Sequence, residues 1–100
     1  MTFTHVVTFT WTEGTDAEVV DGILSALRGF VEGASLEGLR SWDAGRDAGL
    51  APTNADFAVA ATFTDRDAYM AYRDHPEHRR ILDEQIVPRV ASRAAVQFES

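Results

Sequence analysis

Cysteine is absent from this sequence, which excludes disulfides, thiolate nucleophiles and zinc-thiolate sites. A metal site would have to be built from histidines and carboxylates alone. The only close pair of histidines is His75 and His78, Pro76 interrupts their spacing, and no third ligand is obvious. We therefore expect neither a bound metal nor a cofactor.

Lysine is absent too, and the nine basic residues are arginines scattered along the chain without a run. They are outnumbered by 16 acidic residues, which gives a net charge of -7. An acidic chain without a basic patch is a poor ligand for a nucleic-acid backbone or an anionic membrane surface. We expect neither as a partner.

Long apolar runs are also lacking. No stretch approaches the roughly 20 residues that span a bilayer, and the first ten residues show neither the basic nor the apolar region of a secretory signal. A cytoplasmic location is the resulting expectation. The chain has 100 residues, of which 45% are hydrophobic, so we expect one core and one domain over residues 1–100.

Three segments alternate with the period of two that is typical of β-strands: residues 2–11, 57–63 and 93–99. A further short strand is predicted from Leu39 to Trp42. Between them, residues 43–56 are rich in Gly, Asp, Asn and Ala and show no apolar period, which predicts a loop.

Two helical regions separate these strands. Thr15 followed by Glu18 is a capping-box pattern that predicts a helix from about Asp16 to Phe30, with apolar residues at three- and four-residue spacing. Thr64 with Asp67 repeats the pattern before a second, shorter helix.

The second helical region contains a predicted break at His75-Pro76. The residue before a proline is disfavoured in the helical conformation, and proline favours the first position of a helix. One helix should therefore end before Pro76 and another should begin there. The new helix is expected to continue through Ile86, and Pro88 is expected to kink or end it.

The order of these elements, β-α-β-β-α-β, predicts a ferredoxin-like α+β fold in which helices cover one face of a four-stranded antiparallel sheet. The other face would carry Val6, Thr8, Ala58 and Ala60, which are too apolar to remain in water across a whole sheet. No further segment is available to cover it. A homodimer formed through this sheet face is the expected solution.

The corner from Tyr72 to His78 concentrates the chain's polar chemistry. Six residues along one unbroken helix would turn Tyr72 and His78 by about 240° and point them apart, whereas the break at Pro76 lets them face one cavity. In the first turn of the new helix, His78 would stay neutral and could act as a general base. The alternative is that His78 only packs at the corner and that Tyr72 is a core residue.

His5 is the third candidate. It shares a strand face with Phe3, Val7 and Phe9, where a lone histidine is commonly a core residue with its hydrogen bonds satisfied. If the helices cover that face, His5, Tyr72 and His78 would border one apolar cavity, as expected of a small-molecule site. Arg79, next to His78, is either solvated or an anion hook for a carboxylate or phosphate.

The ordered set of residues across the chain resembles the stress-responsive α/β-barrel (Dabb) family. It comprises His5-Val6-Val7-x-Phe9-x-Trp11, Trp42-x-x-Gly45-Arg46-Asp47, Val59-x-x-Thr62-Phe63 and Tyr72-x-x-His75-Pro76-x-His78. The resemblance implies a homodimer in which two ferredoxin-like sheets form a dimeric α/β barrel with the helices outside.

One branch of that family, the plant olivetolic acid cyclase, is a polyketide cyclase. The resemblance implies His5, Tyr72 and His78 as site residues, with Tyr72 and His78 similar to its catalytic pair. It implies Val59 as a further pocket residue. We also expect Leu24, Leu27, Phe63 and Arg79 to line the ligand pocket. Leu24 and Leu27 stand where that cyclase has aromatic residues.

The implied activity is a cofactor-independent intramolecular aldol condensation of an apolar, carbonyl-bearing small molecule, in which His78 removes a proton and Tyr72 stabilises the enolate. Two alternatives stay open at this point. One is a dimeric stress-response module that binds a ligand without catalysis, and the other is a cofactor-free monooxygenase.

Overall fold

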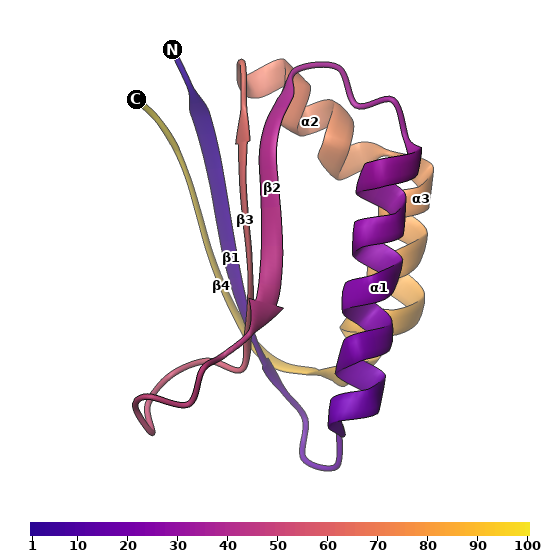
Figure 1. The fold of residues 1–100 in the computed structure, drawn as a ribbon, viewed down its shortest axis with the longest axis vertical. Coiled ribbons are helices and arrows are strands. Elements are labelled where there is room, and N and C mark those ends of the chain that lie inside the picture. Colours follow the sequence, from indigo (N-terminus) through magenta and orange to yellow (C-terminus); the bar gives the residue numbers. More distant parts are fainter.

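The computed structural model describes all residues from 1 to 100, and its elements follow the predicted β-α-β-β-α-β order. Helices α1, α2 and α3 all lie on one side of the sheet, and the other side is bare (Figure 1). The elements are β1 (Phe3–Trp11), α1 (Ala17–Gly33), β2 (Leu39–Arg46), β3 (Phe57–Phe63), α2 (Arg66–Asp74), α3 (Pro76–Ile81), a π-helical turn η1 (Leu82–Ile86), a 3-10 turn η2 (Val87–Arg89) and β4 (Val90–Glu99).

The four strands form one antiparallel sheet in the order β2-β3-β1-β4. The central strand β1 fixes which side chains share a face. Its His5 lies opposite Ala61 of β3 and Gln97 of β4, and Phe9 lies opposite Arg93. The predicted ferredoxin-like fold is confirmed, and this register brings residues nearly a chain length apart side by side.

The core lies between the helices and the sheet. Alternate residues of β1 and β3 are buried, as the period of two predicts, and α1 buries one stripe made of Val20, Ile23, Leu27 and Phe30. Burial of one such side chain contributes about 1.5–3 kcal/mol relative to leaving it exposed. This core holds α1 rigidly over the sheet.

The two helix caps differ from the sequence prediction by one residue each. Asp16, not Thr15, caps α1 by accepting a hydrogen bond from the Val19 amide at 2.9 Å. Asp65, not Thr64, caps α2 by accepting from the Ala68 amide at 2.8 Å. A carboxylate suits the positive end of a helix better than a hydroxyl does, which is why the aspartates take the position. Helix α1 also continues past Phe30 to Gly33.

The prediction of a loop over residues 43–56 was wrong at its start. Strand β2 continues through Arg46, because Ala44 and Arg46 pair with β3 opposite Val59 and Phe57. Pairing to a neighbouring strand here overrides the weak strand preference of Asp, Ala and Gly. The remaining loop leaves the lower end of the sheet (Figure 1).

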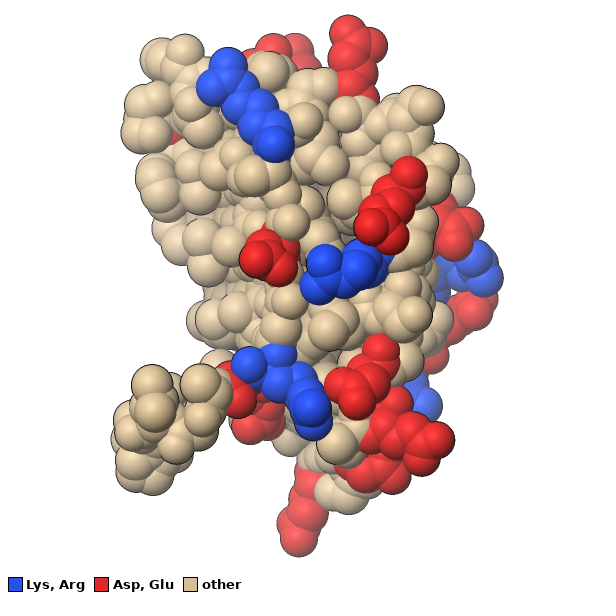
Figure 2. All heavy atoms as spheres, viewed as in Figure 1, with Lys and Arg blue, Asp and Glu red and all other residues tan.

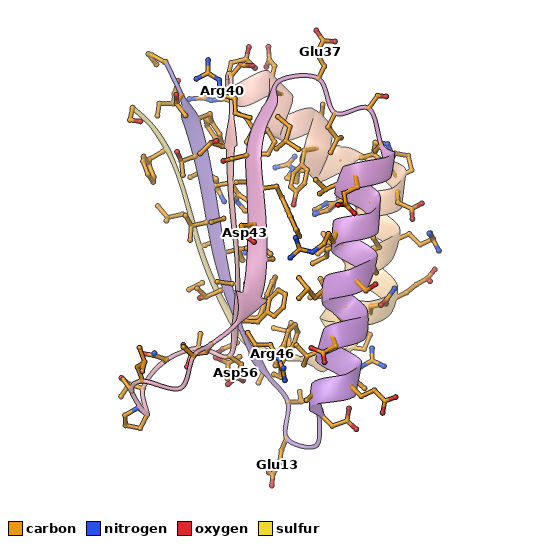
Figure 3. The ribbon with its side chains drawn as sticks, viewed as in Figure 1. Glu13, Glu37, Arg40, Asp43, Arg46 and Asp56 are labelled. Carbon is orange, nitrogen blue, oxygen red and sulfur yellow. The ribbon has the colours of Figure 1, made fainter.

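Asp56 fastens that loop to the sheet. Its carboxylate accepts a hydrogen bond from the Trp11 amide at 2.9 Å, and its own amide donates to the Phe9 carbonyl at 2.9 Å. Figure 3 labels Asp56 at the end of the sheet from which the loop departs. The loop is therefore anchored at its base although its tip is exposed.

The break at His75-Pro76 is confirmed, since α2 ends at Asp74 and α3 begins at Pro76. The expectation of a regular helix up to Ile86 was wrong: after Ile81 the chain widens into the π-helical turn η1 and then tightens into η2, which contains Pro88. Strand β4 then begins at Val90, three residues before the predicted start.

The bare face of the sheet carries exposed apolar side chains beside threonines. By register it carries Val6 and Thr8 of β1, Ala58 and Ala60 of β3, and Val96 and Phe98 of β4. Val96 and Phe98 are 54% and 47% exposed, which is high for large apolar side chains. On the side of the molecule that Figure 2 shows, arginines and acidic residues are interspersed over α1 and β2. None of the helices combines the length and the apolar character that crossing a bilayer requires.

Gly38 offers a test of how β2 and α2 fit together. Its φ is +83°, and a Cβ placed there would come within 2.6 Å of the Ala68 Cβ and 2.7 Å of the Thr64 Oγ1. Gly14 has a similar φ of +91° but open space around it. Gly38→Ala should lower the free energy of unfolding by about 2–4 kcal/mol, from left-handed strain plus overpacking, and Gly14→Ala by only about 1 kcal/mol. Equal losses in urea unfolding would contradict the packing argument.

Candidate functional site

A cavity of about 470 Å³ lies between the helices and the sheet. This size falls in the usual range for small-molecule sites. Its wall is mainly apolar, and two histidines, two tyrosines, three arginines and one aspartate interrupt it. The lining residues are His5, Val7, Phe9, Leu27, Val59, Tyr69, Tyr72, Arg73, His78, Arg79, Leu82, Asp83, Ile86, Val87, Val90 and Arg93.

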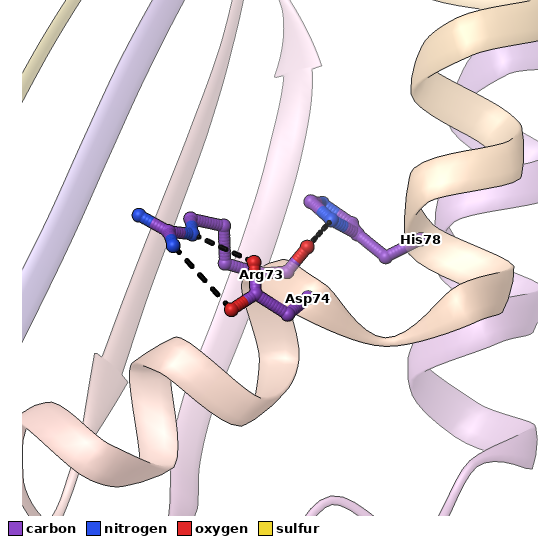
Figure 4. A network of polar contacts seen from close by, with 3 residues as sticks. All are labelled: Arg73, Asp74 and His78. Carbon is purple, nitrogen blue, oxygen red and sulfur yellow. Dashed lines mark hydrogen bonds and ion pairs between the residues drawn. The ribbon is translucent and has the colours of Figure 1, made fainter.

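His78 is held by the corner that Pro76 creates. Its Nδ1 lies 3.0 Å from the carbonyl oxygen of Arg73, as Figure 4 shows. A carbonyl can only accept, so Nδ1 carries the proton and Nε2 keeps a free lone pair. Burial lowers the pKa of His78 below its ordinary value, although the bond to the Arg73 carbonyl opposes the shift. At neutral pH the ring is therefore an uncharged base.

Tyr72 stands beside His78, with ring centroids 4.6 Å apart. Its hydroxyl oxygen accepts a hydrogen bond from the indole Nε1 of Trp42 at 3.1 Å, so its own proton is free to be donated. Burial raises the pKa of Tyr72 to about 12, although the Trp42 bond opposes this. The group is a phenol donor, not a phenolate, near neutral pH.

His5 reaches the same cavity from β1. Its Nδ1 lies 2.8 Å from the side-chain nitrogen of Gln97 on β4. An amide nitrogen can only donate, so the Nδ1 of His5 accepts and its proton sits on Nε2. Burial, with smaller effects of Arg93 and His78, lowers the pKa of His5 to about 4. His5 and His78 are thus both neutral but in opposite tautomers.

These three side chains offer complementary chemistry around one cavity. His78 presents an acceptor, while Tyr72 and His5 present donors. His5 and His78 are only 6% and 8% exposed, so a bound ligand would meet them largely free of competing water. A base with two nearby donors can remove a proton next to a carbonyl and hold the negative charge that develops on oxygen.

Of the other residues expected in the pocket, Leu27, Val59 and Arg79 lie in the cavity wall. Leu24 and Phe63 do not. Leu24 is partly buried at the margin of the core, beside the buried stripe of α1 rather than on it. Phe63 is fully buried and packs against the ring of Tyr72 with centroids 5.3 Å apart, so it supports the site without lining it.

Among the residues that sequence reasoning missed at the site are Trp42, Gln97 and Arg93. Trp42 holds the Tyr72 hydroxyl, Gln97 sets the tautomer of His5, and Arg93 lines the cavity. For Gln97 and Arg93 the usable signal was the alternation of β4, which places them opposite the face of Val96. Which residues of β1 they would meet depends on the strand register, which the sequence alone does not show.

His75 does not line the cavity. Its Nδ1 accepts a hydrogen bond from the Glu77 amide at 3.1 Å and caps α3. No group of three or more histidines, aspartates or glutamates is placed to hold a metal ion.

Two buried neutral histidines make the stability of the fold depend on pH. His5 has a pKa of about 4 when folded and the ordinary value of 6.5 when unfolded, so the unfolded chain binds more protons between these values. The free energy of unfolding should therefore not depend on His5 above pH 6.5. It should fall as the pH drops from 6.5 toward 4, by up to roughly 3 kcal/mol. His5→Gln should flatten this part of the profile, measured by urea unfolding from pH 7 to 4. An unchanged slope in the variant would contradict the assignment.

Comparison with known proteins agrees with this fold. The family model for the stress responsive A/B barrel domain, Dabb, matches residues 3–100. No curated protein matches the sequence. A dimeric ferredoxin-like protein of unknown function from Thermobifida fusca is 36% identical, with a TM-score of 0.88, and the match covers 100% of this chain and 92% of that one.

More distant structures share the fold. A Dabb family protein from Mesorhizobium loti is 21% identical with a TM-score of 0.80, covering 99% of this chain and 96% of its own. A hydroxynitrile lyase from Passiflora edulis is 15% identical, also with a TM-score of 0.80, covering 97% and 91%. The family match over nearly the whole length, together with the 36% identical structure, shows that this chain belongs to the Dabb family of stress-responsive α/β-barrel domains.

Proposed function

We propose that the cavity is the active site of a cofactor-independent enzyme that performs an intramolecular aldol condensation, as in the olivetolic acid cyclase branch of the family. The substrate would be an apolar small molecule with two carbonyl groups. The observation that carries the proposal is the pair of opposite tautomers near Tyr72: His78 has a free Nε2 acceptor and His5 has an Nε2 donor, with ring centroids 4.6 and 6.4 Å from that of Tyr72.

In the proposed reaction, Nε2 of His78 takes the proton from the carbon next to the first carbonyl and becomes an imidazolium. The electrons of that C–H bond form an enolate, whose oxygen accepts hydrogen bonds from the Tyr72 hydroxyl and the Nε2–H of His5. The enolate carbon then attacks the second carbonyl of the same molecule and forms the new C–C bond. The alkoxide produced takes the proton back from His78, and loss of water follows.

The electrostatics of the site support these roles. The pKa of His78 is lowered by burial, so the base is unprotonated at neutral pH without needing a separate activating group. The pKa of Tyr72 is raised to about 12, which keeps its proton available for donation. The open space of about 470 Å³ beside these groups favours a ligand site over a packed, purely structural module.

The fold of the Passiflora edulis hydroxynitrile lyase supports catalysis as a use of this architecture. That protein is an enzyme on the same fold, at 15% identity to this chain.

Proton abstraction can be tested before the substrate is known, with nonan-2-one as the probe. The protein should accelerate exchange of the protons next to the carbonyl for deuterium in D2O, followed by NMR. His78→Ala should reduce the catalysed rate by about 10²–10⁴-fold because the general base is lost. Tyr72→Phe should reduce it by about 10²-fold because an oxyanion donor is lost.

The rate of exchange should also depend on pH. It should rise with pH to a plateau, with a midpoint below pH 6.5, since the pKa of His78 is lowered.

The matched control is His75→Asn, which removes the third histidine but leaves a residue able to cap α3. It should keep the wild-type rate. If the wild type gives no acceleration, or if all three variants behave alike, the aldol proposal is wrong. If the protein converts a ligand of this cavity to a product only in the presence of molecular oxygen, a cofactor-free monooxygenase would be favoured instead.

We further propose that the protein is a homodimer joined through the bare sheet face, completing a dimeric α/β barrel. The exposed Val96 and Phe98, the alanines of β3 and the dimeric state of the Thermobifida fusca protein support this arrangement. Burying these side chains against a second copy would remove their apolar surface from water.

Placing charged residues on the bare sheet face tests the dimer. Val96→Asp combined with Phe98→Asp should convert the dimer to a monomer in light scattering after gel filtration, because four carboxylates would meet at the interface. Ser25→Asp, on the exposed side of α1, adds charge away from the sheet and should leave the dimer intact. A wild-type monomer, or a double variant that remains dimeric, would contradict the proposed interface.

A further inference from the structure

The charged residues around the cavity differ from those elsewhere on the protein. Most of the nine arginines have a partner: Arg28, Arg46, Arg66, Arg73 and Arg80 lie in ion pairs, and Arg40 and Arg89 donate to Thr2 and to the Gln85 carbonyl. Two arginines make neither kind of contact, Arg79 and Arg93. Both line the cavity.

Arg79 and Arg93 approach the cavity from different elements. Arg79 follows His78 on α3, and Arg93 lies on β4 opposite Phe9, whose side chain also lines the cavity. Arg79 contributes to the lowered pKa of His78, and Arg93 contributes to the lowered pKa of His5. Each guanidinium is thus electrostatically close to one of the two imidazoles.

The charged side chains that line the cavity without an ion-pair partner have a net charge of +1. Arg73 is neutralised by Asp74, to which it donates at 3.0 and 3.4 Å (Figure 4). Asp83 also lines the cavity without an ion-pair partner. Against the two charges of Arg79 and Arg93 it supplies one, so the unpaired lining groups sum to 2 - 1 = +1 in a chain of net charge -7.

We infer that the ligand of this cavity carries a carboxylate, bound by Arg79 and Arg93, at one end of an apolar body. Guanidinium groups pair with oxyanions in geometries that also fix orientation. A single surplus positive charge matches a carboxylate monoanion better than a phosphate dianion. The inference rests on the proposed function, in which this cavity is the active site, and it narrows the substrate to an apolar oxo acid.

A bound carboxylate would also serve the chemistry. Two free guanidiniums near His5 and His78 already disfavour the protonated rings, and a carboxylate between them would offset that effect as the base takes up a proton. A carboxylate held by Arg79 and Arg93 would also orient the apolar body of the ligand along the cavity wall.

Binding of octanoate and of its neutral isostere octanamide tests the inference. In isothermal titration at low ionic strength, wild-type protein should prefer octanoate by about tenfold or more, since charge-assisted hydrogen bonds are roughly twice as strong as neutral ones. Arg79→Gln combined with Arg93→Gln should bring the two affinities together while octanamide binding is unchanged. Unchanged octanamide binding also shows that the variant is folded.

Two further variants sharpen the result. Arg40→Gln removes an arginine outside the cavity and should keep the preference for octanoate. Asp83→Asn removes the opposing charge and should increase it. The inference is overturned if wild type binds the two probes equally, if octanoate fails to bind, or if the double variant keeps the preference. It is also overturned if octyl phosphate binds more tightly than octanoate, which would make the anion a phosphate.

The binding experiment and the proton-exchange experiment can succeed or fail independently of each other. Octanoate binding that depends on Arg79 and Arg93, without any exchange of ketone protons, would support a carboxylate site and reject the aldol chemistry. Exchange that depends on His78, with no preference between the two probes, would support the chemistry and reject the carboxylate anchor.

Discussion

The site depends on one missing hydrogen-bond donor, the backbone nitrogen of Pro76. In an unbroken helix the Tyr72 carbonyl would accept from residue 76, which here has no N–H. The His75 amide bonds to that carbonyl instead, at 3.3 Å, and the Glu77 amide turns to the His75 side chain. This frees the Arg73 carbonyl, and the Nδ1 of His78 bonds to it. One proline thereby fixes the tautomer of the base and its position beside Tyr72.

The same logic of fixed donors and acceptors runs through the rest of the site. Trp42 donates a hydrogen bond to the Tyr72 hydroxyl oxygen, and Gln97 donates one to the Nδ1 of His5. Each partner comes from a different strand, so the sheet register sets the protonation pattern of the cavity. Helix α3 supplies His78, and the sheet supplies Trp42 and Gln97, which orient the donors Tyr72 and His5.

Local patterns in the sequence were enough to predict the fold and the corner. The alternation of β1 and β3, the apolar stripe of α1 and the His75-Pro76 break each depend on neighbouring residues, and all three appear in the structure. The partners of Tyr72 and His5 could not be predicted in this way. They depend on which residues of β2 and β4 meet α2 and β1, and the end of β2 is strand only because β3 lies beside it.

The π-helical turn η1 gives this cavity an adjustable wall. Such a turn holds one residue more than the corresponding α-helical turn, and three residues of η1, Leu82, Asp83 and Ile86, line the cavity. Removing a single residue from η1 would restore ordinary helix and rotate the following side chains by about 100° relative to the sheet. A one-residue insertion or deletion in η1 would thus reshape this wall of the cavity, while the corner that holds His78 beside Tyr72 lies before it in the chain.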